Sequence, residues 1–331
     1  MRIGRRTLLR AGLGIAISLI AGYFLLRSVD LAATAKVLLG ASPAWIGVMV
    51  VTVLLDVGAR GARWRSLLAP IAPLPYRRVL GYTYLGYLAN NVLPARLGEL
   101  VRSHALGETE HISRTTVLGT VVVERIVDTA IVVGVAAVAI LMVSAGGIMT
   151  GAVVLGFAFV LVLVVGLTLG VVAHRLPGAD RVVALVAGRP RVLELANRLR
   201  DGLSVAGRPR TLATAIAFSA VAWVASTVTF VAAGRAVGIE LSVAQGALLT
   251  SGVALATIVP SGPGYLGTFE LTAVGIADGF GIGRDQAFAM ALLVHAMILA
   301  VTSVGGTIAA VRLGIGASGL LEEVEGSESP A

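Results

Sequence analysis

The stretch Thr257–Glu270, "TIVPSGPGYLGTFE", interrupts one of the most apolar parts of the chain. It carries two prolines, three glycines and a carboxylate where an uninterrupted membrane helix would be apolar throughout. Prolines end helices, and glycines adopt backbone conformations that are closed to other residues. The stretch therefore predicts a break inside a membrane segment, with Glu270 just beyond the break.

The composition on either side of the break is that of a membrane protein. Of the 331 residues, 57% are hydrophobic and 13% are charged, whereas about a quarter of the residues in a soluble domain are charged. Many apolar runs approach the roughly 20 residues that span a bilayer. We therefore expect an all-α polytopic membrane protein that forms one membrane domain over residues 1–331.

Charge and motifs exclude several classes of function. The net charge of +8 comes from arginines in short loops, which is typical of cytoplasmic loops rather than of nucleic-acid binding. The chain has no cysteine, and its four histidines show no metal-ligand spacing. Zinc-protease, serine-hydrolase and Walker A motifs are absent from the sequence. We expect no enzyme activity, no cofactor, no metal and no nucleic-acid partner.

The arginine clusters also predict how the chain crosses the membrane. If all four basic clusters are cytoplasmic, two apolar runs must enter and leave on the same side. We expect about six full transmembrane helices and two re-entrant hairpins, a cytoplasmic-side hairpin at 79–107 and an outer-side hairpin at 244–281. Both termini are then cytoplasmic. Residues 178–210 read as a cytoplasmic amphipathic segment, with a plain linker helix as the alternative. The six expected spans are 11–26, 44–59, 115–143, 151–173, 211–234 and 286–311.

The two breaks resemble each other. "NVLPARLGELVR" (91–102) and "TIVPSGPGYLGTFELTA" (257–273) both run from proline to Leu-Gly and then to glutamate. Because the hairpins enter from opposite faces, we expect an inverted repeat, and interrupted segments at matching positions indicate a transporter's binding site. A kinked helix packed by its neighbours is the alternative.

Several charged residues belong to the same expected path. Glu124 and Asp128 lie one turn apart in an apolar helix, where ionisable groups face a cavity or a partner; a structural ion-pair cluster is the alternative. Glu99 and Arg102 are spaced to pair, Asp56–Arg60 reads as a structural pair, and His295 reads as packed or hydrogen-bonded. The candidate substrate-binding or translocation residues are Asn90, Asn91, Pro94, Arg96, Glu99, Arg102, Glu124, Arg125, Asp128, Pro260, Gly262, Gly264, Gly267 and Glu270.

Four motifs in order resemble the transmembrane region of lysylphosphatidylglycerol synthases: "RWRSLL" (63–68), "NNVLPARLGELVRSHAL" (90–106), "VVERIVD" (122–128) and "VPSGPGYLGTFE" (259–270). The resemblance covers nearly the whole chain. It implies a lipid-translocating fold related to stand-alone flippase-like proteins. The soluble aminoacyl-transferase part of those synthases is not expected here.

These observations lead to a functional hypothesis with alternatives. We expect flippase-like translocation of a phospholipid or lipid-linked intermediate in the cytoplasmic membrane. Arg96 and the helix N-termini after Pro94 and Pro260 would hold the phosphate. A non-transporting scaffold or accessory subunit for a lipid or cell-envelope enzyme is the alternative, and a membrane transferase is a third. A homodimer is left open.

Overall fold

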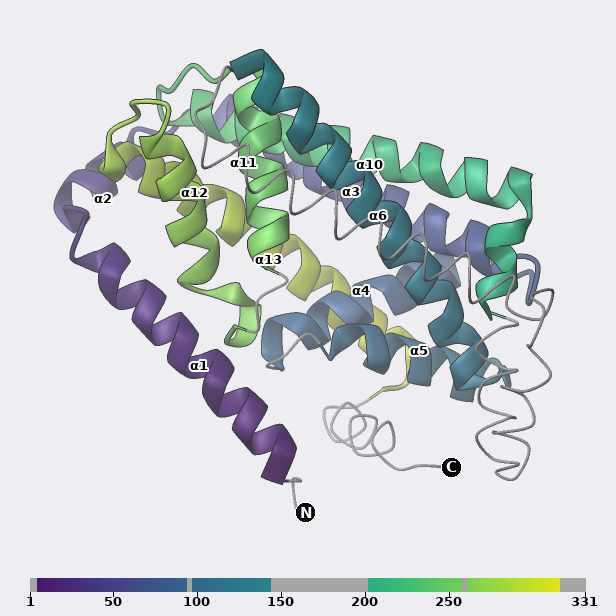
Figure 1. Cartoon of the computed structure of the whole chain (residues 1–331). Helices are drawn as coiled ribbons and strands as arrows, with labels where there is room; N and C mark the ends of the chain where they lie inside the picture. Colours follow the sequence, from purple (N-terminus) through teal and green to yellow (C-terminus); the bar gives the residue numbers. More distant parts are fainter. Residues whose placement is uncertain (1–4, 94–96, 144–201, 258–260, 316–331) are drawn as a thin grey trace, which may run out of the picture.

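The computed structural model describes residues 5–93, 97–143, 202–257 and 261–315, all helices and connections with no strand among them (Figure 1). The α-helices are α1 (Arg5–Leu26), α2 (Leu31–Leu39), α3 (Pro43–Leu68), α4 (Tyr76–Val92), α5 (Gly98–Thr109), α6 (Arg114–Val143), α10 (Pro209–Ala236), α11 (Val243–Ala256), α12 (Thr268–Asp278) and α13 (Arg284–Leu313). Two short 3-10 helices, η2 (Ser204–Gly207) and η3 (Pro263–Tyr265), complete this part of the chain.

Four of these helices, α3, α6, α10 and α13, are long and apolar enough to cross a bilayer, and they coincide with four of the expected spans. A fifth candidate is a pair, 15–26 with α2, that bends by 86°. The chain is thus a multi-pass membrane protein. The expected span 151–173 and most of the expected amphipathic segment 178–210 lie outside the described residues.

Capping residues in the sequence set where several helices begin. The Asp30 side chain accepts hydrogen bonds from the first backbone N–H groups of α2, and Pro43 occupies the first turn of α3, where no N–H is needed. Ser242 and Gln245 form a reciprocal capping box at the start of α11. These capping residues therefore mark where α2, α3 and α11 begin.

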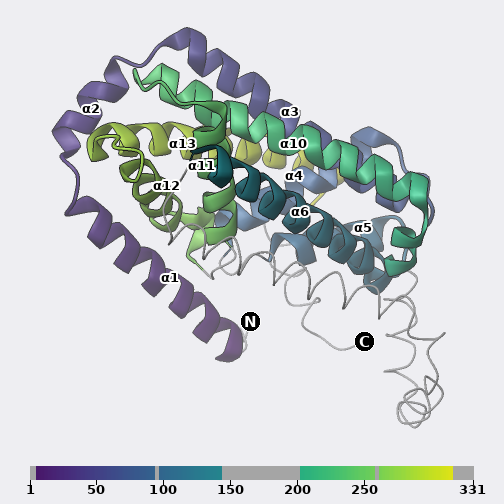
Figure 2. The same cartoon turned by 45° about the horizontal axis from the view of Figure 1, so that its top comes forward.

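Helices α3 and α10 run antiparallel and side by side, along the upper edge of the view in Figure 2. The Ser42 N–H at the start of α3 donates to the carbonyl of Ala236 at the end of α10. Further along, the hydroxyls of Thr52 and Thr229 lie 2.8 Å apart. The buried face of α10 consists largely of alanine, serine and threonine, and small residues let membrane helices approach closely.

A long helix, a broken helix pair and a second long helix occur in this order twice. The first set is α3, α4–α5 and α6, and the second is α10, α11–α12 and α13. Helix α4 packs against α13, and α11 packs against α6. Likewise α5 packs against α6, and α12 packs against α13. Exchanging the two sets reproduces the same helix pairings.

The packing of both broken pairs depends on close approach at glycines, at Gly306 between the two sets and at Gly246 within the second set. A Cβ atom on Gly306 of α13 would lie 2.5 Å from the Leu88 side chain and 2.8 Å from the Tyr84 carbonyl of α4. On the other side, a Cβ atom on Gly246 of α11 would lie 2.6 Å from Val231 of α10. These contacts hold both broken pairs tightly inside the bundle.

Candidate functional site

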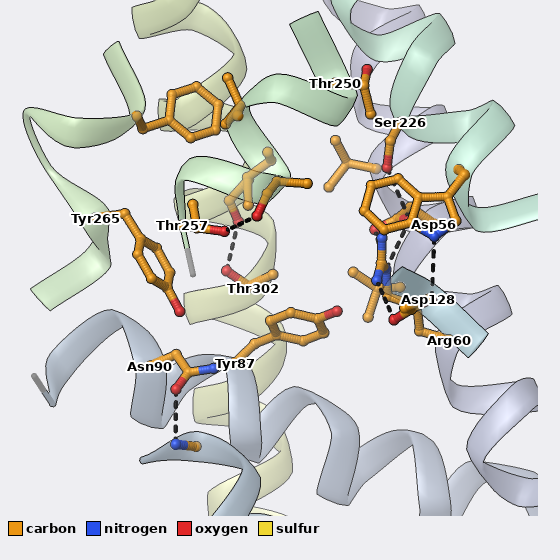
Figure 3. Close-up of a pocket in the computed structure, with 18 of the residues that line it drawn as sticks. Asp56, Arg60, Tyr87, Asn90, Asp128, Ser226, Thr250, Thr257, Tyr265 and Thr302 are labelled. Carbon is orange, nitrogen blue, oxygen red and sulfur yellow. Dashed lines mark hydrogen bonds and ion pairs between the residues drawn. The ribbon is translucent and has the colours of Figure 1, made fainter. Parts of the chain in front are cut away.

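A cavity of about 520 Å³ lies where the two sets of helices meet, and both broken pairs line it. The helices α3–α6 supply charged side chains, namely Asp56, Arg60, Glu99, Arg102, Glu124, Arg125 and Asp128. In the part of α10–α13 that the structure describes, the lining holds no aspartate, glutamate, lysine or arginine and consists of apolar, hydroxyl and aromatic side chains with His295. Figure 3 shows Asp56, Arg60 and Asp128 on one side and Tyr265 and Thr257 on the other. The cavity is therefore amphipathic.

The charged side is built on Glu124. Its Oε1 lies 2.8 Å from Arg63 Nη2, 2.9 Å from Arg102 Nη2 and 2.6 Å from Arg125 Nη2. All three partners are cations, and Arg102 and Arg125 donate charge-assisted hydrogen bonds to this buried carboxylate, while Arg63 adds an ion pair. Glu124 thus joins α3, α5 and α6.

Asp128 extends the cluster by one helical turn. It pairs with Arg63, and its Oδ2 lies 3.5 Å from Arg60 and from Arg125. Arg60 also pairs with Asp56 at 3.0 Å, and Ser226 of α10 donates to Asp56. The cluster therefore reaches across to the second set of helices.

The sequence positions these charges by helical spacing. Asp56, Arg60 and Arg63 follow one another at intervals of four and three on α3, so they share a face. Glu124 and Asp128 do the same on α6. Because α3 and α6 pack together, the two charged faces meet inside the bundle.

Aromatic rings cover the cluster. The Arg102 guanidinium stacks over Trp64 at 4.3 Å, and that of Arg60 stacks over Trp223 at 4.8 Å. The Trp223 indole N–H donates to Asp128 at 3.2 Å. Rings over arginines give cation–π stabilisation and keep the guanidinium plane fixed.

The members of the cluster differ in access. The side chain of Arg63 is fully buried and that of Arg102 is 7% exposed, whereas the side chain of Arg125 is 42% exposed. Glu99 lies 3.8 Å from Arg125 and is the most open carboxylate of the cluster. Arg125 and Glu99 are therefore the charges that a molecule in the cavity can reach first. Four arginines (60, 63, 102 and 125) face four carboxylates (56, 99, 124 and 128), so the cluster is close to neutral.

The first break is held by asparagines. The Asn90 side-chain oxygen accepts a hydrogen bond from Gly98 N at 2.8 Å, so it caps the start of α5 (Figure 3). Asn91 donates to the hydroxyls of Thr302 and Ser303 on α13. Asn90 satisfies a freed backbone group, and Asn91 ties α4 to the second set of helices.

The second break is held by Glu270 and His295. Glu270 accepts from Gly267 N at 2.8 Å and lies 2.6 Å from His295. The backbones of Gly264 and Gly267 have positive φ values of 63° and 84°, which glycine adopts at little cost. Gly262 N donates to Ser18 of α1 at 2.8 Å. Residues 261–267 of the break are therefore packed between α1 and α13.

The structure sorts the residues expected from the sequence into two groups. Glu99, Arg102, Glu124, Arg125 and Asp128 lie in the charged cluster, whereas Gly262, Gly264, Gly267 and Glu270 form the second break. Asn90 and Asn91 connect the first break to its surroundings. Pro94, Arg96 and Pro260 lie outside the described residues.

Two expectations from the sequence are corrected, one about an ion pair and one about a phosphate position. Arg102 pairs with Glu124, and Glu99 lies near Arg125 instead of pairing with Arg102, because α5 presents these side chains to α6. The phosphate position expected at the start of α12 is taken by the Glu270 carboxylate, which accepts from Gly267 N. The positive end of this helix is thus neutralised within the chain.

Sequence reasoning missed part of the site. Arg63 and Trp223 belong to the charged cluster, and His295 reaches the second break from α13. The signal for Arg63 was its spacing from Asp56 and Arg60 in an apolar helix. No local signal joins His295 to Glu270, since they are 25 positions apart.

Comparisons with known proteins agree with this architecture. A protein named glycosyltransferase AglD, from Haloferax volcanii, is 27% identical over 365 residues, covering 97% of this chain and 57% of the relative. The chain thus spans a little over half the length of that relative. The model of the lysylphosphatidylglycerol synthase transmembrane region matches residues 12–306. The chain belongs to the lysylphosphatidylglycerol synthase transmembrane-region family.

Proposed function

We propose that the protein moves a phospholipid or a lipid-linked intermediate between the leaflets of the cytoplasmic membrane in a flippase-like manner. The observation that carries this proposal is the amphipathic cavity between the two sets of helices. Its charged side suits a polar headgroup, and its apolar and hydroxyl-bearing side suits the start of a lipid tail. Its volume of about 520 Å³ falls within the range of small-molecule sites.

The charged cluster lowers the cost of bringing a headgroup into the bundle. A charge taken into hydrocarbon costs a few kcal/mol or more, by order of magnitude, unless partners replace its water shell. Arg125 is exposed to the cavity and carries its positive charge beside Glu99. In this mechanism Arg125 binds the phosphate, and Glu99 binds hydrogen-bond donors of the headgroup.

Both broken pairs act as re-entrant hairpins in this proposal. Support comes from the antiparallel α3 and α10, because the broken pairs that follow them begin at opposite ends of the bundle. It also comes from the identical helix pairings of the two sets. Together these features favour an inverted repeat, in which each hairpin closes the path from one side.

The charge distribution supports the orientation. Arg65 lies in the last turn of α3, and Arg77 and Arg78 lie at the start of α4. Arg208 and Arg210, at the start of α10, lie at the same end of the antiparallel pair. Arginine-rich connections favour the cytoplasm. In the proposed orientation, both termini of the chain are cytoplasmic.

Reconstitution tests the proposal. The purified protein is placed in vesicles with phosphatidylglycerol that carries a fluorescent tail label, and dithionite bleaches the label in the outer leaflet. The wild type is expected to make the inner-leaflet label accessible faster than empty vesicles do. Arg125→Gln is expected to slow this movement, because it removes the open cation of the cavity. The matched control is Arg114→Gln, since Arg114 is also 42% exposed but pairs with Glu108 outside the cavity.

The outcomes separate binding from general damage. Equal rates for Arg125→Gln and the wild type would remove the proposed role of Arg125. A wild type that moves no lipid, whether phosphatidylglycerol or a polyprenyl-phosphate sugar, would contradict the function itself. The second probe is chosen because the relative is named a glycosyltransferase.

A further inference from the structure

The contacts of His295 define where its protons lie. The His295 Nε2 lies 2.6 Å from the carbonyl oxygen of Gly264, and its Nδ1 lies 2.6 Å from Glu270 Oε1. A carbonyl oxygen only accepts hydrogen bonds, so Nε2 carries a hydrogen. The second contact also needs a hydrogen, because an unprotonated Nδ1 and a carboxylate would face each other with lone pairs.

The pair therefore holds one shared proton between Nδ1 and Oε1. The proton belongs either to an imidazolium beside a carboxylate or to a carboxylic acid beside a neutral imidazole. Both arrangements are neutral overall. Loss of this proton would leave a negative charge on a pair of side chains that are each 4% exposed, with no hydrogen between them. The carboxylate would keep its hydrogen bond from Gly267 N, but its Oε1 would face the lone pair of Nδ1 at 2.6 Å in a buried site. This arrangement is strongly unfavourable, so the contact between Glu270 and His295 opens when the proton leaves.

The same pair fastens the second break. His295 reaches Gly264 within η3, and Glu270 accepts from Gly267 N at the start of α12. The Phe269 ring stacks on the imidazole at 4.3 Å and keeps its plane fixed. Residues 261–267 are thus tied to α13 directly by the Gly264–His295 contact and indirectly through Glu270, and Gly262 also ties them to Ser18 of α1.

The surroundings leave this proton without a competing charge on neighbouring helices of the second set. In the described part of the chain, α11 holds no ionisable residue, and α10 has Arg210 and Arg235 towards its two ends. In α1 and α2 the described side chains include Tyr23 and Lys36, and in η3 Tyr265. Other ionisable side chains line the same cavity as His295. They are Tyr87 of α4, Asp56 and Arg60 of α3, and Glu99, Arg102, Glu124, Arg125 and Asp128 of α5 and α6.

From this geometry we propose that Glu270 and His295 form a proton-binding site whose occupancy holds residues 261–267 closed over the cavity. Proton release frees this segment, and proton binding closes it again. Because His295 also lines the cavity, the inference rests on the proposed lipid translocation and supplies its coupling ion. The direction follows from the shared proton: lower pH keeps the contact, and higher pH opens it.

A single spin label tests this site. The chain has no cysteine, so Leu266→Cys gives one labelling position, and Leu266 is exposed beside Gly267. In the labelled wild type in detergent, the mobile fraction of the spectrum is expected to rise with pH. For one proton, the ratio of open to closed forms changes by about tenfold per pH unit around the midpoint.

The informative variant is Glu270→Gln. Its amide N–H can donate to His295 Nδ1 and its oxygen can still accept from Gly267 N–H, so both contacts persist without a titrating carboxyl group. This variant is expected to show a spectrum that stays immobile over the same pH range. Asp278→Asn is the matched control on the same helix, and it is expected to titrate like the wild type, since Asp278 pairs with Arg284 away from the cavity.

The outcomes distinguish a failure of the proton-binding site from a failure of the proposed lipid translocation. A wild-type spectrum that does not change with pH, or one that changes equally in Glu270→Gln, would overturn the proton site. If Glu270→Gln does not fold, nitrogen-15 NMR of histidine-labelled wild type decides, because His295 must keep a hydrogen on Nε2. A bare Nε2 would overturn the site as well. Failure to move lipid with an intact spin-label titration would contradict the proposed function alone.

Discussion

Glu124 shows how one buried carboxylate can fix several helices. It lies against Arg63, Arg102 and Arg125, while its side chain is only 2% exposed. Desolvation of such a residue is costly, and its three cationic partners offset that cost. The position therefore serves both the architecture and the charge of the cavity.

We predict that Glu124→Ala destabilises the protein, because it leaves buried arginines without their shared partner. Breaking a buried ion pair costs about 3–5 kcal/mol. Thermal unfolding in detergent is expected to show a clearly lower Tm than in the wild type. Glu108→Ala is the control, since the exposed pair of Glu108 with Arg114 is worth about 0–1 kcal/mol. Equal Tm values for the two variants would show that the cluster does not stabilise the fold.

At the scale of elements, the second break depends on close contact with α1. A Cβ atom on Gly267 would lie 2.6 Å from the Ser18 carbonyl oxygen and 3.0 Å from Gly22 N. Gly267 also has a positive φ of 84°. Both the space and the backbone conformation therefore require glycine at this position.

We predict that Gly267→Ala displaces α1 from α12 and weakens the fold by more than Gly281→Ala does. Gly281 is the matched control, because its φ is 77° but nothing lies within 4 Å of an added Cβ atom. The backbone strain is thus similar, and the difference measures the contact with α1. The readout is the Tm of each variant in detergent. Equal losses of stability would contradict the packing of α1 on the second break.

The breaks themselves were predictable from the sequence, and the contacts that hold them were not. Proline and glycine mark positions where a helix cannot continue, so the gaps between α4 and α5 and between α11 and α12 follow from local chemistry. The prediction that His295 is packed or hydrogen-bonded is confirmed, but its partners Glu270 and Gly264 could not be named from the sequence, because they come from other elements. Asn91 and Thr302 are likewise joined only by the packing of α4 on α13. Long-range contacts of this kind leave no periodic signal in the sequence.

At the scale of the whole molecule, the antiparallel α3 and α10 divide the chain into two comparable sets of helices. Among the described residues, the aspartate, glutamate and arginine side chains of the cavity come from the first set, and the second set contributes apolar and hydroxyl-bearing side chains with His295. The difference between the two break sequences, one with Arg96 and one without a basic residue, matches this division. Similar backbones thus carry different halves of one amphipathic cavity.

The proposed orientation gives a prediction for intact membranes. Arg77 lies at the end of the bundle where α3 finishes, and Glu240 lies at the end where α10 finishes. Because α3 and α10 are antiparallel, these exposed positions are at opposite ends. With no native cysteine, Arg77→Cys and Glu240→Cys each provide one thiol. We expect an impermeant maleimide to label Glu240→Cys in intact cells and Arg77→Cys in inside-out vesicles only.

The two variants control for each other, since each must be labelled from one side and protected from the other. Labelling of both thiols from the same side would contradict the antiparallel crossing of α3 and α10. The reverse pattern would keep the crossing but place the arginine-rich end outside, against the bias of positive residues towards the cytoplasm. The charged cluster lies towards the Arg77 end of α3, beyond the Thr52–Thr229 contact. The expected pattern would therefore put the headgroup-binding side of the cavity nearer the cytoplasmic leaflet.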